Sequence, residues 1–536
     1  MRCALALSRA QFGLAAPLVQ VEAHVGPGLP NLNLVGLAAP VVRESRERVR
    51  AAILSSGFEY PNGRITLNMA PAELSKQGGR FDLPIALAIL VGAGQIRPPQ
   101  RGFECYGELG LDGELRPVAG LLLAALHAQL ADHALIVPSA NVAEVALSGH
   151  PSVHGVDNLL EAAEIFSGCE PSLSARPLAR TRRAPALPGP VAAPRPLPPP
   201  ELLLSQVVGQ AHVKRALIVA AAGGHSLLMI GPPGSGKSML AARLPALLPP
   251  LSSVEALEVA GIASTAGIRL ETQGWLRRPF RCPHHSSSTQ AIVGGGPQIR
   301  PGEITLAHHG VLFLDELPEF DRRVLESLRE PLETGAVTIA RAAARLEMPA
   351  RFQLVAAMNP CPCGYFGDPA GRCHCSRLRV ERYRQRISGP LLDRIDIRVE
   401  VPRVPGAEFA LPLAGEAPPA AAPAAVPAPA VFVPDANALV QRAQHWRLQR
   451  SGCLSARLDA AQLQRCCSMS RSTRELLVLR AEELTLSGRG LHRILAVART
   501  VADLAGSESI ETPHIIEAVQ LRRPIEMVYD GTVTRP

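Results

Sequence analysis

A short glycine-rich segment constrains the fold of this chain more than any other part of the sequence. SLLMIGPPGSGKSMLAARL, residues 226–244, reads as an apolar strand, a tight turn and the start of a helix. Its turn fits the pattern G-x-x-x-x-G-K-[ST], in which glycines let backbone N–H groups approach phosphate oxygens at a helix N-terminus. The segment therefore predicts a phosphate-binding loop in an α/β sheet. The residues of this loop are Gly231, Pro232, Pro233, Gly234, Ser235, Gly236, Lys237 and Ser238.

Polar residues follow two further apolar runs, and they complete a nucleotide site. Asp315 and Glu316 come directly after the run 311–314, so they lie at the carboxyl end of a strand, where open α/β sheets bind ligands. We expect Lys237 to hold the β- and γ-phosphates, Ser238 and Asp315 to bind Mg²⁺, and Glu316 to polarise the attacking water. Asn359 ends the run 352–358 and either orients that water or turns the chain before Pro360.

Two proline-rich segments divide the chain into three parts. Residues 169–200 form a Pro/Arg-rich linker and residues 405–434 a Pro/Ala-rich linker, neither of which can bury a core. Residues 1–168 mix strand-like and helical runs, which predicts an α/β domain. Residues 201–404 alternate short apolar runs with helical segments, which predicts a parallel sheet flanked by helices. Residues 435–536 show helical spacing and predict a small helical bundle.

Composition indicates in which cellular compartment the protein works and which class of partner it binds. The formal net charge of +8 favours a polyanionic partner such as nucleic acid. Arg9 interrupts the first apolar run, and no apolar run approaches the roughly 20 residues needed to cross a bilayer. We therefore predict a cytoplasmic protein without a membrane partner. Eleven cysteines in such a chain do not indicate a disulfide framework.

Four of the cysteines form one tight cluster in CPCGYFGDPAGRCHC, residues 361–375. Four thiolates can hold one tetrahedral Zn²⁺, which would be structural because no coordination position stays open. The single residue between the members of each pair is shorter than usual for zinc, so reduced thiols and a redox disulfide remain alternatives. The proposed zinc ligands are Cys361, Cys363, Cys373 and Cys375.

Several longer blocks resemble the YifB/ComM family of magnesium-chelatase-like AAA+ ATPases. They are FRCPHHSSSTQAIVGGG, GVLFLDELPEF, AAMNPCPCGYFGDP, RISGPLLDRIDI, NLNLVGLAAPVVRESRERVRAAI and RITLNMAPAELSKQGGRFDLPIALAIL. The resemblance covers nearly everything outside the two linkers. It implies an AAA+ core, a carboxy-terminal helical lid like that of magnesium chelatase, and a homo-hexameric ring.

The resemblance also assigns roles to residues outside the phosphate loop. Arg394 in LLDRIDI corresponds to an arginine finger that acts on a neighbouring subunit's ATP, although alone it could pair with Asp393 or Asp396. Asn359 takes the position called sensor 1.

Three further positions concern the adenine and the lid. Gly209 and Gln210 lie where such ATPases contact adenine. Arg489, or else Arg493, corresponds to the sensor 2 arginine, an assignment weakened by Ala496, where many relatives carry a basic residue.

The amino-terminal part resembles the proteolytic domain of Lon proteases through GELGLDGELRPVAGLLLAA and the helix near Lys76. That peptidase needs a Ser nucleophile activated by a Lys. Arg80 and Leu122 occupy these two positions here. We therefore predict a Lon-like domain without peptidase activity.

The family resemblance implies a motor that promotes DNA branch migration in natural transformation and recombination, with DNA and recombination proteins as partners. Backbone gripping needs cations on loops that face the pore of the ring. The candidates, any of which could be ordinary surface charge, are Arg277, Arg278, Arg281, Arg341 and Arg345. The nearby Cys282, His284 and His285 are interpreted as a polar, DNA-facing loop. The alternatives are a metal-insertion ATPase of the magnesium-chelatase type and a protein unfoldase.

Overall fold

The computed structural model describes residues 3–35, 40–72, 74, 76, 78–168, 204–268, 275–296, 300–341, 344–367, 371–404, 436–484 and 486–522. The chain divides into two compact units. The first comprises Met1–Arg195, Ser252–Trp275 and Gln298–Pro301, and the second Pro196–Leu251, Leu276–Pro297 and Gly302–Pro536. Both proline-rich linkers lie outside the described residues.

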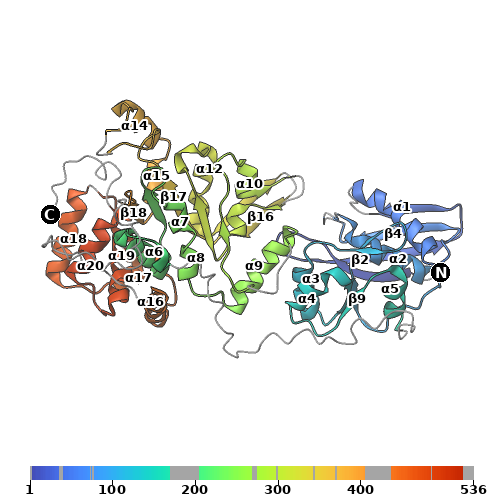
Figure 1. Cartoon of the computed structure of the whole chain (residues 1–536). Helices are drawn as coiled ribbons and strands as arrows, with labels where there is room; N and C mark the ends of the chain where they lie inside the picture. The colour runs from blue at the N-terminus through green and yellow to red at the C-terminus, as the bar shows by residue number, and fades with distance from the viewer. Residues whose placement is uncertain are drawn as a thin grey trace, which may run out of the picture. The chain divides into compact units, whose positions relative to one another are not determined.

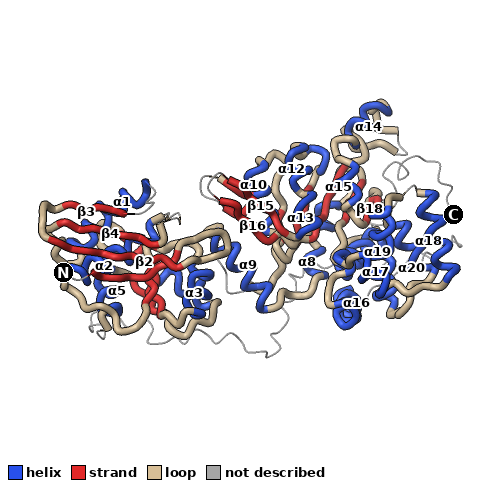
Figure 2. Tube along the Cα trace, turned by 180° about the vertical axis from the view of Figure 1, so that it is seen from behind, coloured by secondary structure: helices blue, strands red, loops and turns tan. Residues whose placement is uncertain are grey.

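A mixed seven-stranded sheet forms the first unit. Its strands, in spatial order, are β3 (Asn31–Val35), β4 (Arg64–Ala70), β2 (Leu18–Gly26), β1 (Cys3–Arg9), β5 (Phe103–Cys105), β8 (Ala134–Pro138) and β9 (Val153–Val156). β2 pairs antiparallel with β1 and β4, whereas the remaining pairs are parallel. Figure 2 shows β2, β3 and β4 side by side. Alternate residues of β4 are buried, as expected for strands that bury one face.

Helices cover this sheet and complete the first core. They are α1 (Pro40–Ser55), α2 (Asp82–Gly92), α3 (Leu121–Leu130), α4 (Val142–Ala146) and α5 (Leu159–Phe166), and a short hairpin is formed by β6 (Glu108–Leu109) and β7 (Leu115–Arg116). α2 is apolar and buried through most of its length, because it packs against β1 and β2.

The two positions that would hold a Lon-type dyad are buried in the first unit. The Arg80 guanidinium donates to the carbonyl oxygens of Arg9 and Ala119 and to Gln11 Oε1. Leu122 packs in an apolar cluster with Leu147 and Ala260. Neither position presents a nucleophile or a base to solvent.

One helix of the first unit comes from a distant part of the sequence. α9 (Ser253–Thr265) starts with a capping box at Ser252 and packs against α3, with Gly261 so close to Leu123 that a β-carbon would collide with it. Ser264 donates to Glu144 of α4, and Gln11 donates to the Thr265 carbonyl at 3.1 Å. α9 therefore packs with the amino-terminal domain, although it lies within 201–404 in the sequence.

A parallel five-stranded sheet organises the second unit. Its strands, in spatial order, are β11 (Phe280–Arg281), β14 (Val311–Leu314), β17 (Gln353–Met358), β10 (Leu227–Ile230) and β18 (Ile397–Glu400). Every residue of β10, β14 and β17 is buried, which explains their continuous apolar sequences.

Short helices and one hairpin connect these strands. The helices are α6 (Ala211–Gly223), α7 (Lys237–Ala241), α8 (Leu244–Leu247), α10 (Thr289–Val293), α11 (Glu303–Leu306), α12 (Arg322–Ser327), α13 (Arg329–Thr334), α14 (Arg377–Arg384) and α15 (Gly389–Asp393). The antiparallel hairpin consists of β15 (Ala336–Arg341) and β16 (Ala344–Pro349).

The carboxy-terminal region is helical, as predicted, and packs against α6 (Figure 1). Its helices are α16 (Ala436–Ser451), α17 (Ala460–Cys466), α18 (Arg471–Glu483), α19 (Gly488–Ala505) and α20 (Thr512–Gln520). We call these helices the lid. The predicted α/β fold with a parallel sheet and a helical carboxy-terminal region is confirmed. No helix within the described part of the chain is long and apolar enough to cross a membrane.

Candidate nucleotide site

Three parallel strands bring the predicted catalytic residues to one edge of the second sheet. Ile230 at the end of β10 pairs with Met358 of β17, and Leu314 at the end of β14 pairs with Ala356. The phosphate loop, Asp315 and Asn359 each follow one of these ends. They therefore meet at the carboxyl edge of the sheet, where open α/β folds bind ligands.

The phosphate loop owes its shape to its glycines. A β-carbon on Gly231 would come within 2.2 Å of the Val401 carbonyl oxygen, so this position has no room for a side chain. Gly234 and Gly236 have φ of 75° and 90°, a region that L-residues with side chains rarely adopt. α7 begins directly afterwards at Lys237, which leaves its first backbone N–H groups available for an anion.

Lys237 is held inside the loop. Its Nζ donates to the carbonyl oxygens of Gly231 at 2.8 Å and Pro232 at 2.9 Å, and to Asn359 Oδ1 at 3.2 Å. Burial lowers the pKa of Lys237, and the carboxylates of Asp315 and Glu316 partly oppose that shift. The structure thus brings Lys237, predicted to hold the phosphates, into contact with Asn359, predicted to orient the attacking water.

Ser238 and Asp315 form the pair expected at a magnesium site. Ser238 Oγ donates to Asp315 Oδ2 at 2.6 Å, and the Glu316 N–H donates to Asp315 Oδ1 at 2.9 Å. A hydroxyl and a carboxylate are oxygen donors of the type that Mg²⁺ prefers together with nucleotide phosphates. The donor set therefore fits Mg²⁺ at this position.

Glu316 has a partner that the sequence did not indicate. Its backbone is in the left-handed region, with φ of 53°, and its Oε2 lies 3.2 Å from His285 Nδ1. The His285 ring also makes an edge contact with Phe320 and lies against His284. His284 in turn bonds Ser286 Oγ at 2.8 Å. The two histidines thus bond a carboxylate and a hydroxyl, and His285 links its loop to the expected catalytic acid.

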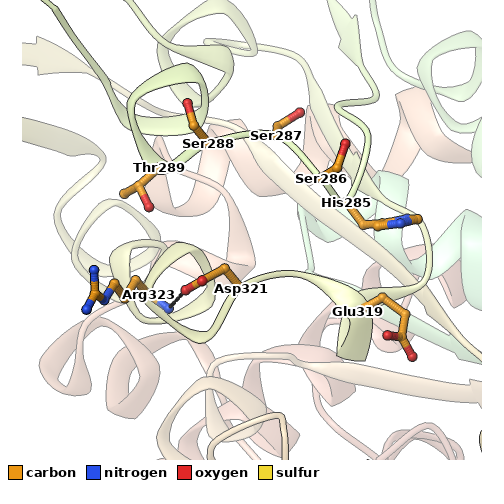
Figure 3. Close-up of a pocket in the computed structure, with 8 residues that line it drawn as sticks. All are labelled: His285, Ser286, Ser287, Ser288, Thr289, Glu319, Asp321 and Arg323. Atoms are coloured by element: carbon orange, nitrogen blue, oxygen red, sulfur yellow. Dashed lines mark hydrogen bonds between the residues drawn. The ribbon is translucent and has the colours of Figure 1, made fainter.

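A polar pocket of about 490 Å³ opens beside this loop (Figure 3). Figure 3 shows Ser286, Ser287 and Ser288 on one side of the pocket and Glu319, Asp321 and Arg323 on the other. The pocket is lined by His285, Ser286, Ser287, Ser288, Thr289, Glu319, Asp321 and Arg323. Its mixed charges favour no ligand class.

Gln210 fastens the segment expected near adenine. Gln210 is the N-cap residue of α6 and has a left-handed backbone. The preceding Gly209 also has a left-handed backbone, with φ of 63°. Gln210 Nε2 donates to the carbonyl oxygens of Ser235 at 2.8 Å and Pro402 at 3.1 Å. The segment is therefore tied to the phosphate loop and to the chain after β18.

The three arginines assigned by resemblance bind carboxylates of their own chain. Arg394 and Arg489 both reach Glu333, at 2.6 Å and 3.3 Å. Arg493 pairs with Asp396 at 3.1 Å. Glu333 carried no motif in the sequence and was missed, and the partner of Arg394 is neither Asp393 nor Asp396.

The four cysteines of the cluster converge. Cys361, Cys363, Cys373 and Cys375 have sulfur atoms within 4.8 Å of one another. Burial, together with hydrogen bonding to Cys363, raises the pKa of Cys361 to about 12. Burial acts in the same direction on Cys363, but hydrogen bonds led by the Tyr365 backbone outweigh it and lower its pKa to about 6. Gly364 in this loop packs on Pro233 of the phosphate loop.

The arginines predicted to bind DNA are in different situations. Arg277 is exposed. Arg278 donates to the carbonyl oxygens of Pro249 and His309, each at 2.7 Å, and Arg281 forms two bonds to Glu303. Arg341 and Arg345 lie in β15 and β16 near the hairpin tip, but their side chains are outside the described part of the structure.

Three family models match the chain along most of its length. They are described as subunit ChlI of Mg-chelatase for residues 21–141, magnesium chelatase, subunit ChlI for 203–409, and magnesium chelatase, subunit ChlI C-terminal for 435–522. The second covers the sheet with the phosphate loop and the third covers the lid.

Individual relatives match over nearly the full length. Competence protein ComM of Haemophilus influenzae is 41% identical over 529 residues, which is 98% of this chain and 99% of that protein. The uncharacterized protein YifB of Escherichia coli is 41% identical over 527 residues, 97% of each chain. The magnesium-chelatase 38 kDa subunit of Cereibacter sphaeroides is 27% identical over 188 residues, only 29% of this chain and 52% of that protein.

The site therefore has the residues of an AAA+ ATPase that uses ATP and Mg²⁺. Identity of 41% across the whole length leaves no doubt about kinship. This chain belongs to the YifB/ComM family of magnesium-chelatase-like AAA+ ATPases.

Proposed function

We propose that this ATPase is a hexameric motor that moves DNA strands and promotes branch migration during natural transformation and recombination. The observation that carries the proposal is the full-length similarity to a relative named competence protein, in a chain with an excess of positive charge. The chelatase similarity covers a much smaller share of the chain. A metal-insertion ATPase and a protein unfoldase remain the alternatives.

In this proposal the nucleotide site works as the sequence predicted. Lys237 leaves its carbonyl partners for the phosphates, Ser238 and Asp315 hold Mg²⁺, and Glu316 polarises water together with Asn359. Each role is supported by the convergence of these side chains at the ends of β10, β14 and β17.

Glu316→Gln is expected to bind ATP normally and to lower turnover by about 100-fold or more, since it removes the base while preserving the side-chain shape. Lys237→Ala is expected to weaken ATP binding itself. The measurements are affinity for a fluorescent ATP analogue and steady-state phosphate release. Glu319→Gln is the matched control, because Glu319 is an exposed carboxylate three residues away that pairs with Arg386. Normal turnover in Glu316→Gln would refute the catalytic assignment.

Arg394 is proposed to complete the site of a neighbouring subunit. Its bonds within the chain go to Pro390 on α15 and Glu333 on α13, and neither partner belongs to the phosphate loop. A site that uses this guanidinium would then receive it from another chain, which is the reason for proposing a ring.

Arg394→Ala is expected to keep ATP affinity and to lose hydrolysis by about 1,000-fold, the effect typical of a trans arginine. Mixing it with Glu316→Gln should restore part of the activity, because some interfaces then combine an intact Glu316 with an intact Arg394. Phosphate release is measured in rings verified to contain both variants. Absence of rescue in such rings would refute the trans role.

The cysteine cluster is proposed to hold a structural Zn²⁺. Sulfur atoms of a tetrahedral site with Zn–S bonds near 2.3 Å lie about 3.8 Å apart. Here the separations are 3.3 Å for Cys361 and Cys363, 3.6 Å for Cys363 and Cys373, and 3.8 Å for Cys361 and Cys373. Since Cys361 follows Asn359 by two residues and Gly364 contacts Pro233, the ion would brace the nucleotide site.

Elemental analysis of protein purified without chelator is expected to find about one zinc per chain. Cys363→Ser or Cys373→Ser should lose the metal and weaken ATP binding, because the loop against Pro233 would lose its support. Cys453→Ser, a thiol outside the cluster, is the control. A metal-free preparation that is folded and fully active would exclude the zinc site.

The β15–β16 hairpin is the proposed DNA-contacting element, with Arg341 and Arg345 near its tip and exposed Arg277 as a further contact. Arg278 and Arg281 already have partners in the chain, so they would have to exchange them to contact DNA. Backbone gripping of this kind is nearly independent of sequence and falls steeply with salt.

The double variant Arg341→Ala/Arg345→Ala is expected to bind branched DNA more weakly, with a salt dependence reduced by about 1 or more in log–log slope. ATP affinity should not change. The matched control is the double variant Arg377→Ala/Arg471→Ala, which removes one exposed charge from α14 and one from the lid. The decisive assay uses purified protein, ATP and a mobile four-way junction. If DNA is not bound, does not stimulate hydrolysis and is not branch-migrated, the chelatase alternative is favoured.

A further inference from the structure

Glu333 joins two arginines that come from different parts of the second unit. Its Oε1 accepts from Arg394 Nη2 at 2.6 Å and lies 3.3 Å from Arg489 Nη1. Arg394 follows α15, whereas Arg489 lies in the first turn of lid helix α19. A single carboxylate oxygen therefore contacts both guanidinium groups and offsets part of the repulsion between these like charges.

The guanidinium of Arg394 forms two short hydrogen bonds, but one of its nitrogen atoms has no hydrogen-bond partner. The Arg394 side chain is 8% exposed, and its Nη1 donates to the Pro390 carbonyl at 2.7 Å. Its Nε is buried without a hydrogen-bond partner. Because a buried unsatisfied donor is costly, the guanidinium retains unused capacity for an acceptor.

Glu333 also lies at the base of the β15–β16 hairpin. It is the second-last residue of α13, and β15 begins three residues after it, at Ala336. Thr338 Oγ1 donates to Glu330 Oε1 at 3.2 Å, and the Ala350 N–H donates to the Gly335 carbonyl at 2.7 Å. These bonds tie Thr338 of β15 and Ala350, which directly follows β16, to α13 and to its C-cap residue Gly335.

We propose that Glu333 is a latch that restrains Arg394 and Arg489 until the hairpin is occupied, and so couples polyanion binding to ATP hydrolysis. The proposal rests on the trans role of Arg394. A neighbour's polyphosphate and Glu333 compete for the same guanidinium groups. Displacement of α13 by a strand on the hairpin weakens the Glu333 contacts and releases both arginines to the phosphate.

Glu333 and Asp396 both bind arginines, but they differ in solvent exposure, and this difference distinguishes the proposed latch from a structural ion pair. Glu333 is 41% exposed and Arg489 66% exposed, so their pair contributes little stability and exchanges readily. Asp396, the partner of Arg493, is only 2% exposed and also accepts from the Ser226 N–H at 3.0 Å and contacts His225. Asp396 therefore fixes the lid, and Glu333 is free to change partners.

The test compares ATP turnover of full-length Glu333→Gln and Glu333→Ala with wild type, without DNA and with saturating single-stranded DNA. Both variants are expected to raise DNA-independent turnover by about fivefold, and to reduce the ratio of stimulated to basal turnover toward one. ATP affinity should stay unchanged because the phosphate loop is untouched. Glu333→Asp, which keeps the charge on a shorter chain, should lie between wild type and Glu333→Gln.

Glu330→Gln is the matched control, since it removes a carboxylate from the same helix that contacts the hairpin but neither arginine. It should keep wild-type basal turnover. Basal turnover that is unchanged or lower in folded Glu333→Gln and Glu333→Ala, with Arg394→Ala inactive, overturns the latch alone. If Arg394→Ala itself hydrolyses ATP at the wild-type rate, both the trans role and the latch fall. The basal measurement needs no DNA, so it decides the latch even if the DNA proposal is wrong.

Discussion

The nucleotide site depends on one constraint, the parallel alignment of the fully buried strands β10, β14 and β17. The carboxyl ends of parallel strands lie at the same edge of a sheet, so the residues that follow these strands lie close together. Lys237 reaches Asn359 across 122 positions of sequence, and Ser238 reaches Asp315 across 77. Apolar burial of the strands thus determines where the polar chemistry lies.

This constraint explains which parts of the site could be predicted from sequence. The phosphate loop is a local pattern whose glycines and flanking strand and helix are adjacent in the chain. Asp315, Glu316 and Asn359 were predictable because they follow apolar runs, and the resemblance added the sensor 1 position for Asn359. The contacts that Glu333 makes with two arginines and that His285 makes with Glu316 could not be predicted, because they form only when helices and loops pack.

The first unit shows the same limit. Its mixed sheet follows from alternating and apolar runs, and the predicted absence of a Ser/Lys dyad rests on Arg80 and Leu122, which can be read directly from the sequence. The packing of α9 beside Leu122 could not be predicted from the sequence, because it joins segments more than 130 residues apart. Leu122 now fills an apolar cluster with Ala260, and Arg80 is bound by carbonyl oxygens and Gln11, which also donates to the end of α9. Both Arg80 and Leu122 thus take part in the packing of the first unit.

Burial also decides how three similar arginines behave in the second unit. Arg493 meets a carboxylate that is almost fully enclosed and has further partners, and breaking such a pair leaves an uncompensated buried charge. Arg394 and Arg489 share a carboxylate that solvent reaches, so under the proposed latch a phosphate would replace contacts to a partly exposed carboxylate and not to a buried one. The same attraction between guanidinium and carboxylate therefore fastens the lid at Asp396 and, in our proposal, leaves Arg394 and Arg489 exchangeable at Glu333.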